Sequence, residues 1–246
     1  MNDKPKLSIV IPAYKEEKCI YSTIDEILKA HDCLDYKYEI IVVVDGSPDE
    51  TAREARKHRS SKVRVFDYPK NHGKGYALKY GTEKAQGEII TFVDAGGDFD
   101  PVQFDKCVKL MEIFDADFVI GSKRHPASKI NYPLARRIYS WFYHKLVRVL
   151  FGIHVTDTQT GLKFLKRKVA KAVLPRIVVK QYAFDLEMLV IAYQLGFRRI
   201  FEAPVEMKFN TSKTGAANLK TIQRMVYDTL AIFYRAKILN YYLKQK

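Results

Sequence analysis

The stretch that decides the fold is Glu88–Pro101, which reads E-I-I-T-F-V-D-A-G-G-D-F-D-P. Its first half is an apolar run rich in β-branched residues, which is typical of a strand buried on both faces. Its second half carries three carboxylates, Asp94, Asp98 and Asp100, around a pair of glycines. Ligands of open α/β sheets bind just beyond the carboxyl ends of the strands. The stretch therefore predicts a central strand with a ligand site at its end.

Two interpretations of this acidic end remain open from the residues alone. Hard carboxylate oxygens on a turn loosened by glycine suit Mg²⁺ or Mn²⁺ that holds the diphosphate of a substrate. The plainer interpretation is a strand-to-helix turn in which Asp100 caps a helix that starts at Pro101.

Strand and helix patterns alternate on both sides of this stretch. The other predicted strands cover 7–11, 38–44, 63–66 and 117–121, and the predicted helices cover 19–31, 49–59, 71–84 and 101–114. Such alternation with short connections specifies an α/β fold with a Rossmann-like, doubly wound, mostly parallel sheet. The strand ends at Tyr14, Asp45 and Asp94 then line one crevice, which is the expected nucleotide site.

The second half of the chain has a different pattern. We predict a helix over 134–151, a turn over 155–161, a strand over 162–165, a helix over 184–194 and a strand pair over 198–209 broken at Pro204. The first of these helices is dense in aromatic residues around Trp141. Those residues belong either to the core or to an exposed groove for an isoprenoid chain.

The chain ends in a long helical pattern over 219–243 that combines an apolar stripe with basic residues. The stripe consists of Ile222, Val226, Thr229, Leu230 and Phe233. This pattern is typical of a helix lying on a membrane surface, and a helix packed on its own domain looks similar. The positive charge favours the membrane surface. We therefore divide the chain into a domain over 1–215 and a C-terminal amphipathic segment over 216–246.

Composition narrows the class of partner. The net charge of +14 and the pI near 9.5 predict an anionic partner, either nucleic acid, anionic lipid headgroups or phosphorylated substrates. The basic residues are spread along the chain without a nucleic-acid motif, which argues against nucleic acid. Three cysteines without paired spacing favour a reducing, cytoplasmic compartment over a disulfide framework. No apolar run reaches the roughly 18 residues of a membrane span, so we expect a protein that does not cross a membrane.

Seven segments resemble a known enzyme family. Four of them resemble the inverting family-2 glycosyltransferases of GT-A fold: Ser8–Glu17, Val44–Thr51, Asn71–Gly75 and Val93–Asp98. Three more are similar to the polyprenyl-phosphate hexosyltransferases, with dolichyl-phosphate glucosyltransferases first and dolichol-phosphate mannose synthases next: Thr156–Lys163, Ala183–Leu189 and Glu202–Glu206. The resemblance covers about residues 6–215.

The resemblance implies transfer of a hexose, with inversion, from a nucleotide-sugar (UDP-glucose or GDP-mannose) to a polyprenyl (dolichyl) phosphate. It also implies a Mg²⁺ or Mn²⁺ cofactor and a peripheral position at the cytoplasmic face of a membrane. A polyprenyl phosphate is already largely dianionic at pH 7, so the acceptor needs alignment more than a strong base. The departing nucleoside diphosphate needs its developing charge neutralised, and a divalent cation does this.

Site residues carry over from the resemblance by position. Nucleotide binding is assigned to Pro12, Ala13, Tyr14, Glu16, Asp45, Lys74, Asp94 and Ala95. The metal is assigned to Asp94 and Asp98, and catalysis to Asp157. The acceptor phosphate is assigned to Lys123, Arg136, Ser140 and Lys213. Arg136 and Ser140 are four residues apart, so they share a face of the predicted helix.

Three positions depart from the family pattern. Gly96 replaces the second metal aspartate, and Asp98 is the candidate substitute because the two glycines before it allow unusual backbone angles. Val44 replaces an acid that often reads the base. The mannose synthases have a late basic motif that contains an arginine and a lysine. Residues 211–218 of this chain lack both at the matching positions, and Lys213 or Lys220 would substitute.

Two other functions remain open: a glycosyltransferase with a non-lipid acceptor, and a non-catalytic GT-A domain that only binds a nucleotide-sugar. The second is suggested by Gly96. The sequence does not determine the sugar, the length of the polyprenol or the oligomeric state. Because we find no membrane span, a membrane protein is a further candidate partner for handling the product.

Overall fold

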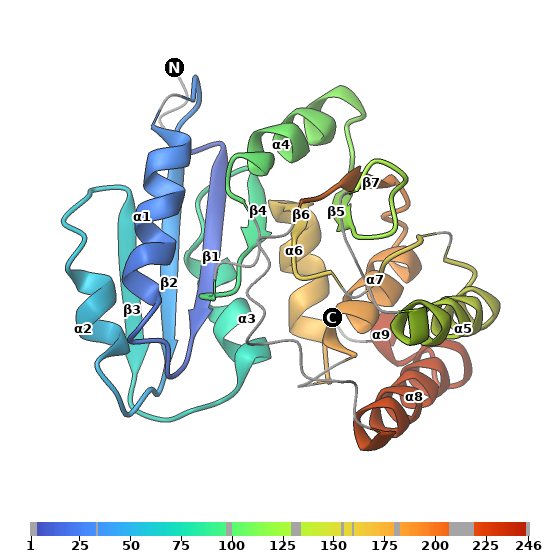
Figure 1. Ribbon diagram of the computed structural model, residues 1–246. Coiled ribbons are helices and arrows are strands. Elements are labelled where there is room, and N and C mark those ends of the chain that lie inside the picture. Colours follow the sequence, from blue (N-terminus) through green and yellow to red (C-terminus); the bar gives the residue numbers. More distant parts are fainter. Residues whose placement is uncertain are drawn as a thin grey trace.

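The fold is known from a computed structural model, which describes residues 4–32, 34–96, 100–128, 134–153, 155–158, 160–179, 183–206 and 219–244. Its described part is built on a seven-stranded sheet in the order β3-β2-β1-β4-β6-β5-β7, with helices on both faces (Figure 1). This confirms the predicted α/β fold with a mostly parallel sheet.

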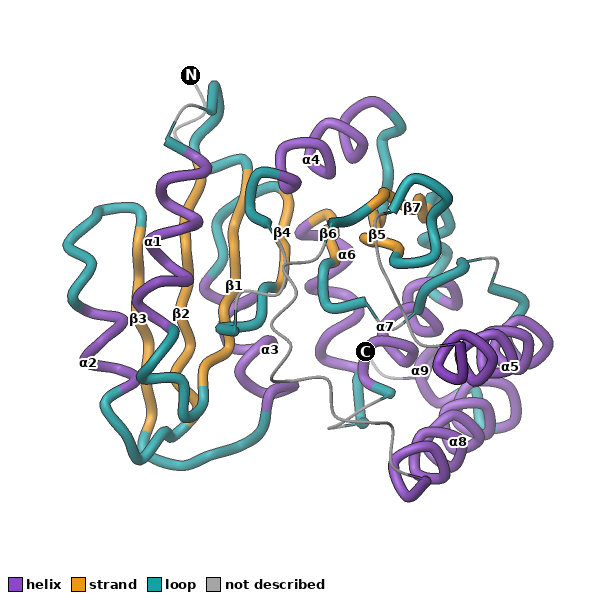
Figure 2. Tube along the Cα trace, viewed as in Figure 1, coloured by secondary structure: helices purple, strands orange, loops and turns teal. Residues whose placement is uncertain are grey.

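The elements follow one another as strand and helix through most of the chain (Figure 2). The strands are β1 (Leu7–Ala13), β2 (Tyr38–Asp45), β3 (Val63–Tyr68), β4 (Ile89–Phe92), β5 (Phe118–Ser122), β6 (Lys163–Lys166) and β7 (Ile200–Pro204). The helices are α1 (Ile20–His31), α2 (Thr51–Arg56), α3 (Lys74–Lys84), α4 (Gln103–Ile113), α5 (Leu134–Phe151), α6 (Arg167–Val173), α7 (Phe184–Gln194), α8 (Leu219–Phe233) and α9 (Tyr241–Lys244), with a 3₁₀ turn η1 (Leu174–Arg176) and a π-helical turn η2 (Tyr234–Ile238).

The directions of the strands place the carboxyl ends of β1, β2 and β4 at the same edge of the sheet. β1 pairs in parallel with β2 on one side and with β4 on the other, so the winding of the sheet reverses between β1 and β4. β6 runs antiparallel to both β4 and β5, so the residues just before Lys163 lie beside the end of β4 at Phe92. We call the edge at which β1, β2 and β4 end the carboxyl edge; it is the lower edge of the sheet in Figure 1.

Alternating residues of the central strands feed two separate cores, one on each face of the sheet. Ile9 and Ile11 of β1 belong to a cluster that includes side chains of α1 and α4. Val10, between them, belongs to a cluster formed with α3, α6, α7 and α8. Successive side chains of a strand point to opposite faces, so a continuous apolar run is what a strand covered on both sides needs. This explains why the strands read as unbroken apolar stretches.

Most predicted elements are present, with differences at their ends. The helices predicted over 134–151 and 184–194 have those same bounds in α5 and α7. α2 ends at Arg56, three residues before its predicted end, and α6 was not predicted. The described part of the predicted strand pair forms β7 and an isolated bridge at Glu206, and the remainder lies outside the described residues.

The single long helix predicted over 219–243 is wrong in its second half. α8 ends at Phe233, the chain continues through η2, and Asn240 adopts a left-handed backbone with a φ of 48° before α9 begins. Asparagine tolerates this conformation better than most residues other than glycine. The chain therefore turns at Asn240 and brings α9 back onto the domain.

α8 carries two apolar stripes instead of the one that was predicted. Thr229 and Ile232 are buried against the domain. Leu230, predicted to belong with them, is 48% exposed and lies on the outer side of the helix. Tyr227 and Tyr234, three and four residues away from it, are also exposed, and residues at this spacing share one helix face. Within the described residues, no helix is long and apolar enough to cross a bilayer.

A buried glutamate ties the end of the chain to the domain. Glu187 of α7 is fully buried, and its Oε2 accepts hydrogen bonds from the backbone N–H groups of Val178 (2.9 Å) and Val179 (2.7 Å). Its Oε1 accepts from Arg235 (3.1 Å) and from the hydroxyl of Tyr242. Burial, with Glu187 beside it, raises the pKa of Tyr242 above its usual range, so this hydroxyl remains a donor. The segment over 219–244 is thus joined to α7 through one carboxylate.

We predict that Glu187→Ala lowers the free energy of unfolding by about 3–5 kcal/mol, because it leaves the largely buried Arg235 without its counter-ion. Denaturant titration followed by circular dichroism measures the change. The control is Glu54→Ala, which removes an exposed pair with Lys57 and should cost less than about 1 kcal/mol. Equal effects of the two substitutions would contradict the role given to Glu187.

Candidate functional site

Three loops at the carboxyl edge enclose a hollow of about 730 Å³. They are the loop after β1, the loop after β2 and the turn after β4. The lining residues are Lys15, Glu16, Glu17, Lys18, Cys19, Pro48, Asp49 and Gly96. Because the winding of the sheet reverses between β1 and β4, topology alone places a ligand site here. We call this hollow the edge pocket.

The loops after β1 and β2 are joined by short polar side chains. The backbone N–H of Lys15 donates to Ser47 Oγ (2.8 Å), and that of Glu16 donates to Thr51 Oγ1 (2.9 Å). The Ser47 and Thr51 hydroxyls both donate to Asp49 Oδ1. Partial burial opposes ionisation of Asp49, but these hydrogen bonds outweigh it and lower the pKa of the carboxyl below its usual value. The two loops therefore form one hydrogen-bonded wall of the edge pocket.

Asp45, at the end of β2, organises the loop that leads into α3. It is 3% exposed, and its carboxylate accepts hydrogen bonds from the Tyr68 hydroxyl (2.9 Å) and from the backbone N–H groups of His72 (2.8 Å) and Gly73 (2.7 Å). Burial, with Asp45 next to it, raises the pKa of Tyr68, so its hydroxyl stays protonated. Asn71 also donates to the Asp45 backbone carbonyl (2.9 Å). A residue predicted to bind nucleotide thus also positions the loop before Lys74.

Lys74 and Asp94 form an ion pair across the carboxyl edge. Lys74 is the first residue of α3, and its Nζ lies 2.6 Å from Oδ1 of Asp94, two residues beyond β4. The side chains are 51% and 44% exposed, so both remain accessible to a ligand. The next residue, Ala95, is buried, and its carbonyl accepts a hydrogen bond from Thr23 of α1, which holds the turn after β4 in place.

The residues at this turn fit a cation that is shared with a ligand rather than held by protein alone. Within the described part of the chain, no group of three or more His, Cys, Asp or Glu side chains could hold a metal ion. Asp94 supplies one accessible carboxylate, and Asp98 lies outside the described residues. Mg²⁺ is commonly bound through one or two carboxylates together with substrate phosphates and water. Asp94 satisfies that lower requirement.

A second polar group lies at the same edge, across β6 from Asp94. The backbone N–H of Lys123, just after β5, donates to Asp157 Oδ2 (3.0 Å). The backbone N–H of Asp157 donates to Glu202 Oε1 on β7 (3.1 Å). Asp157 is 9% exposed. The structure therefore brings the predicted catalytic residue and one predicted phosphate residue together.

The remaining predicted site residues divide into three groups. Pro12 and Ala13 end β1, and Tyr14 follows with its ring 43% exposed. Glu16 lines the edge pocket, and its Oε2 lies 2.8 Å from Cys19 Sγ. Arg136 and Ser140 are in α5, but their side chains lie outside the described set, as do Asp98 and Lys213 altogether.

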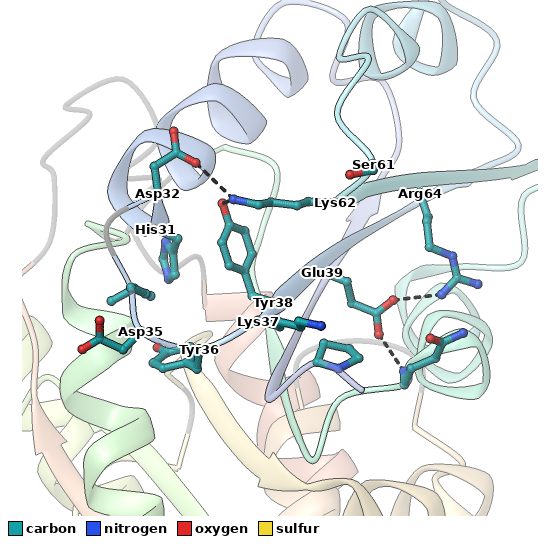
Figure 3. Close-up of a pocket in the computed structure, with 13 residues that line it drawn as sticks. His31, Asp32, Asp35, Tyr36, Lys37, Tyr38, Glu39, Ser61, Lys62 and Arg64 are labelled. Atoms are coloured by element: carbon teal, nitrogen blue, oxygen red, sulfur yellow. Dashed lines mark hydrogen bonds and ion pairs between the residues drawn. The ribbon is translucent and has the colours of Figure 1, made fainter. Parts of the chain in front are cut away.

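A hollow of about 520 Å³ lies at the opposite, amino edge of the sheet (Figure 3). It is lined by residues at the starts of β2 and β3, among them Tyr38 and Lys62. Four of its charged side chains form two ion pairs: Lys62 with Asp32 (3.2 Å) and Arg64 with Glu39 (2.9 Å). These paired charges and the distance from the strand ends distinguish it from the edge pocket, and we do not assign the transfer site to it.

Four residues that hold the candidate site in place were not predicted from the sequence. Tyr68 and Asn71 hold Asp45, Thr51 joins two loops, and Glu202 holds the Asp157 turn. The segments that contain Asn71, Thr51 and Glu202 were each singled out as resembling the family, and that resemblance was the available signal. Tyr68 lay just beyond the predicted strand and had no signal of its own.

Comparison with known proteins shows the family. The family described as glycosyl transferase family 2 matches residues 8–174. A dolichyl-phosphate beta-glucosyltransferase of Trichomonas vaginalis is 33% identical over 245 residues, covering 93% of this chain and 72% of that protein. The Drosophila melanogaster protein of the same name is 33% identical, covering 79% and 65%. The human one is 34% identical, covering 76% and 63%.

Solved structures share the fold at lower identity. Mannosyl-3-phosphoglycerate synthase from Rubrobacter xylanophilus superposes with a TM-score of 0.72 at 20% identity, covering 98% of this chain and 76% of that one. Glucosyl-3-phosphoglycerate synthase from Mycobacterium tuberculosis, solved with Mn²⁺, UDP and phosphoglyceric acid, gives a TM-score of 0.67 at 21% identity, covering 94% and 78%. These likenesses confirm the expected GT-A fold.

We predict that Gly46→Ala destabilises the protein more than Gly152→Ala. Both glycines have a positive φ, of 59° and 68°, which costs an alanine about 1–2 kcal/mol. A Cβ at Gly46 would also overlap the backbone of Lys70 and Asn71, whereas one at Gly152 would meet nothing. The clash should add about 1–3 kcal/mol. Denaturant titration of both variants measures the difference, and equal losses would show that the 70–73 loop yields freely.

Proposed function

The chain belongs to glycosyl transferase family 2, and from this premise we propose that it transfers glucose, with inversion, from UDP-glucose to a dolichyl-type polyprenyl phosphate. The observation that carries the proposal is the accessible Lys74–Asp94 pair at the point where the sheet reverses. A lysine and a carboxylate at that point suit a diphosphate and the cation bound to it. In this assignment the enzyme is a polyprenyl-phosphate hexosyltransferase.

The choice of donor and acceptor is supported by the relatives. Several proteins about one third identical to this chain are named dolichyl-phosphate beta-glucosyltransferases. A protein of the same fold has been solved with Mn²⁺ and UDP-glucose. GDP-mannose, the other donor considered from the sequence, is less well supported: the mannosyl-3-phosphoglycerate synthase shares the fold at 20% identity, whereas the relatives that are about one third identical are named glucosyltransferases.

The proposed reaction needs an aligned acceptor and a stabilised leaving group. An oxygen of the polyprenyl phosphate attacks the anomeric carbon of glucose from the face opposite the nucleotide. A new carbon–oxygen bond forms as the bond to the diphosphate breaks, and the bonding electrons leave with UDP. We assign Lys74 to the diphosphate, and Lys123 and Asp157 to the acceptor side across β6. A divalent cation bound by Asp94 would neutralise the charge that develops on the leaving diphosphate.

The outer surface of α5 and α8 suits contact with a lipid bilayer. These helices lie side by side, joined by a hydrogen bond between the Tyr143 hydroxyl and Thr229 Oγ1 (3.0 Å) (Figure 1). α5 exposes Trp141, Phe142 and Val149, α8 exposes Tyr227 and Leu230, and η2, which continues α8, exposes Tyr234. We call these six residues the outer apolar face. The exposure of Trp141 and Phe142 argues against the core, one of the two interpretations that the sequence left open.

Basic residues surround this face. Lys145 Nζ lies 4.1 Å from the centre of the Trp141 ring, and Arg148 and Arg224 are exposed on the same two helices. Aromatic residues interleaved with basic ones are typical of helices at the surface of anionic membranes. We therefore propose that the protein is peripheral, with the outer apolar face on the cytoplasmic surface of a membrane that supplies the acceptor. A separate membrane protein partner is a further proposal without a contact to support it.

The alternative is a nucleotide-sugar-binding domain without activity, suggested by Gly96 in place of a second metal aspartate. The transfer assay below separates it from the proposed enzyme. A glycosyltransferase with a non-lipid acceptor is less well supported because the relatives named above are dolichyl-phosphate enzymes and the outer apolar face is otherwise unexplained.

We expect the protein to move radiolabel from UDP-[¹⁴C]glucose into organic-extractable dolichyl phosphate when Mn²⁺ or Mg²⁺ is present. EDTA should abolish the transfer, and GDP-mannose should give little. Asp94→Asn should lower kcat/KM by about 100-fold or more, because it removes the accessible carboxylate that faces the diphosphate.

Two further variants serve as tests of that result. Asp98→Asn should also lower activity if Asp98 is a second ligand. Asp100→Asn is the matched control, since its side chain accepts a hydrogen bond from the Val102 backbone N–H (3.1 Å) at the start of α4. Nucleotide binding without any transfer by the wild-type protein would establish the binding domain instead.

We predict that Leu230→Ser combined with Tyr234→Ser weakens binding to anionic phospholipid vesicles by about tenfold or more. Removing one buried leucine-sized side chain costs about 1.5–3 kcal/mol. Co-sedimentation with vesicles of phosphatidylcholine and phosphatidylserine measures it. Ile113→Ser, at an exposed position of α4 near the amino edge, is the control and should bind like wild type. Equal binding by all three proteins would rule out this face.

A further inference from the structure

We propose that Glu202 is a positioning residue of the transfer site, which holds Asp157 and, through it, the loop of Lys123. This inference rests on the proposed function, because it gives Glu202 a role in the transfer of the sugar. Glu202 lies in β7, almost fifty residues along the chain from Asp157, and it was assigned no role from the sequence.

One oxygen of Glu202 receives three donors from the turn that carries Asp157. Its Oε1 accepts from the Thr156 backbone N–H (3.0 Å), the Thr156 hydroxyl (2.7 Å) and the Asp157 backbone N–H (3.1 Å). Consecutive N–H groups that converge on one carboxylate form a tight anchor, because hydrogen bonds to a charged acceptor are stronger than neutral ones. The turn that carries Asp157 is therefore anchored to β7, a strand distant from it in the sequence.

The anchor extends from Asp157 to the loop after β5. Asp157 Oδ2 accepts the backbone N–H of Lys123, and the Ser122 and Thr156 hydroxyls are 3.0 Å apart. The Arg124 guanidinium reaches the Thr156 carbonyl at 3.5 Å. Each of these contacts involves Thr156 or Asp157, the two residues that Glu202 holds. A shift of the turn would move Asp157 and Lys123 together.

The sheet gives Glu202 a rigid base. β7 pairs in parallel with β5, with Glu202 opposite Ile120 and Pro204 opposite Ser122. Glu202 thus projects from an edge strand that pairs with β5 on one side, and it lies opposite Ile120, two residues before β5 ends at Ser122. Sites built on strands hold their geometry more closely than sites built on loops alone.

Nearby arginines offset the negative charges of Glu202 and Asp157. Burial lowers the pKa of His144 on α5, the neighbouring Arg124 and Arg148 lower it further, and Glu202 and Asp157 raise it. Two arginines and two carboxylates are thus close enough to this imidazole to affect its pKa. Glu202 therefore adds its charge to a group in which cations from the β5 loop and α5 offset it, and an uncharged acceptor can replace it without leaving a buried charge unpaired.

The positioning role of Glu202 predicts different effects on nucleotide binding and on the rate of transfer. The edge pocket is built from the loops after β1, β2 and β4, and no described residue of these loops is hydrogen-bonded to the Glu202 side chain, whose donors are Thr156 and Asp157. Loss of Glu202 should therefore leave the affinity for UDP unchanged. A displacement of about 1 Å at a reacting group lowers rate by as much as about 100-fold, so kcat should fall.

The test compares Glu202→Ala with Glu202→Gln, because glutamine keeps the Oε1 acceptor and loses only the charge. Amide hydrogen exchange followed by mass spectrometry should show faster exchange over 155–158 in Glu202→Ala than in wild type or Glu202→Gln. In the transfer assay, kcat should fall about 10- to 100-fold in Glu202→Ala and stay within about fivefold in Glu202→Gln. Glu112→Ala, which removes an ion pair with Lys6 at the amino edge, is the control.

The outcomes separate the failure of this inference from the failure of the proposed function. Unchanged exchange over 155–158 in Glu202→Ala overturns the inference whether or not the protein is active. Weaker UDP binding in Glu202→Ala, or equal losses in the alanine and glutamine variants, overturns it too. No transfer by wild type, with exchange faster only in Glu202→Ala, overturns the proposed function and leaves the anchoring of the turn supported.

Discussion

The two oxygens of the buried Asp45 carboxylate hold the loop that brings Lys74 to the carboxyl edge. They accept the backbone N–H groups of His72 and Gly73, which precede α3, and the hydroxyl of Tyr68 at the end of β3. Without this acceptor, three partly buried donors would each lose a hydrogen bond to a charged group, a bond worth about 1.5–3 kcal/mol. Lys74 follows directly, so its distance to Asp94 depends on Asp45. The ion pair that defines the candidate site is thus a consequence of a hydrogen-bonded turn.

Acidic side chains have two different tasks around this edge. Asp45 and Glu202 accept backbone N–H groups and thereby hold loops, whereas Asp94 is half exposed and pairs with Lys74. A carboxylate that already receives several donors gains little from a cation and would lose those bonds to bind one. An exposed carboxylate with one lysine partner can exchange that partner for another cation. This difference favours Asp94 over Asp45 and Glu202 as the residue for a divalent ion.

The sequence predicted elements well and contacts between distant segments poorly. The helices over 134–151 and 184–194 were predicted with their observed bounds because each is a run without glycine or proline that ends close to a glycine. The turn at Asn240 was missed because one left-handed residue in an otherwise helical pattern has little signal. Leu230 was assigned to the packed stripe because α8 has apolar residues on two sides, and periodicity cannot say which side meets the domain. The strand ends at Asp45 and Asp94 were predicted to meet, since parallel topology requires it, but the anchor at Glu202 depends on a register that only the folded sheet defines.

Among the described residues of the turn after β4, Asp94 supplies one accessible carboxylate, which bears on how donor and cation would bind in the proposed enzyme. Asp94 alone would hold Mg²⁺ or Mn²⁺ weakly, because such ions need several oxygen ligands. The diphosphate of the donor supplies further oxygens, so each ligand would raise the affinity for the other by the same factor, as linkage requires. Lys74 strengthens this coupling: a cation at Asp94 displaces its ammonium, which is then available to the diphosphate. In the proposed enzyme, Gly96 in place of a second aspartate would thereby shift the site from binding a metal beforehand toward binding the metal together with the nucleotide-sugar.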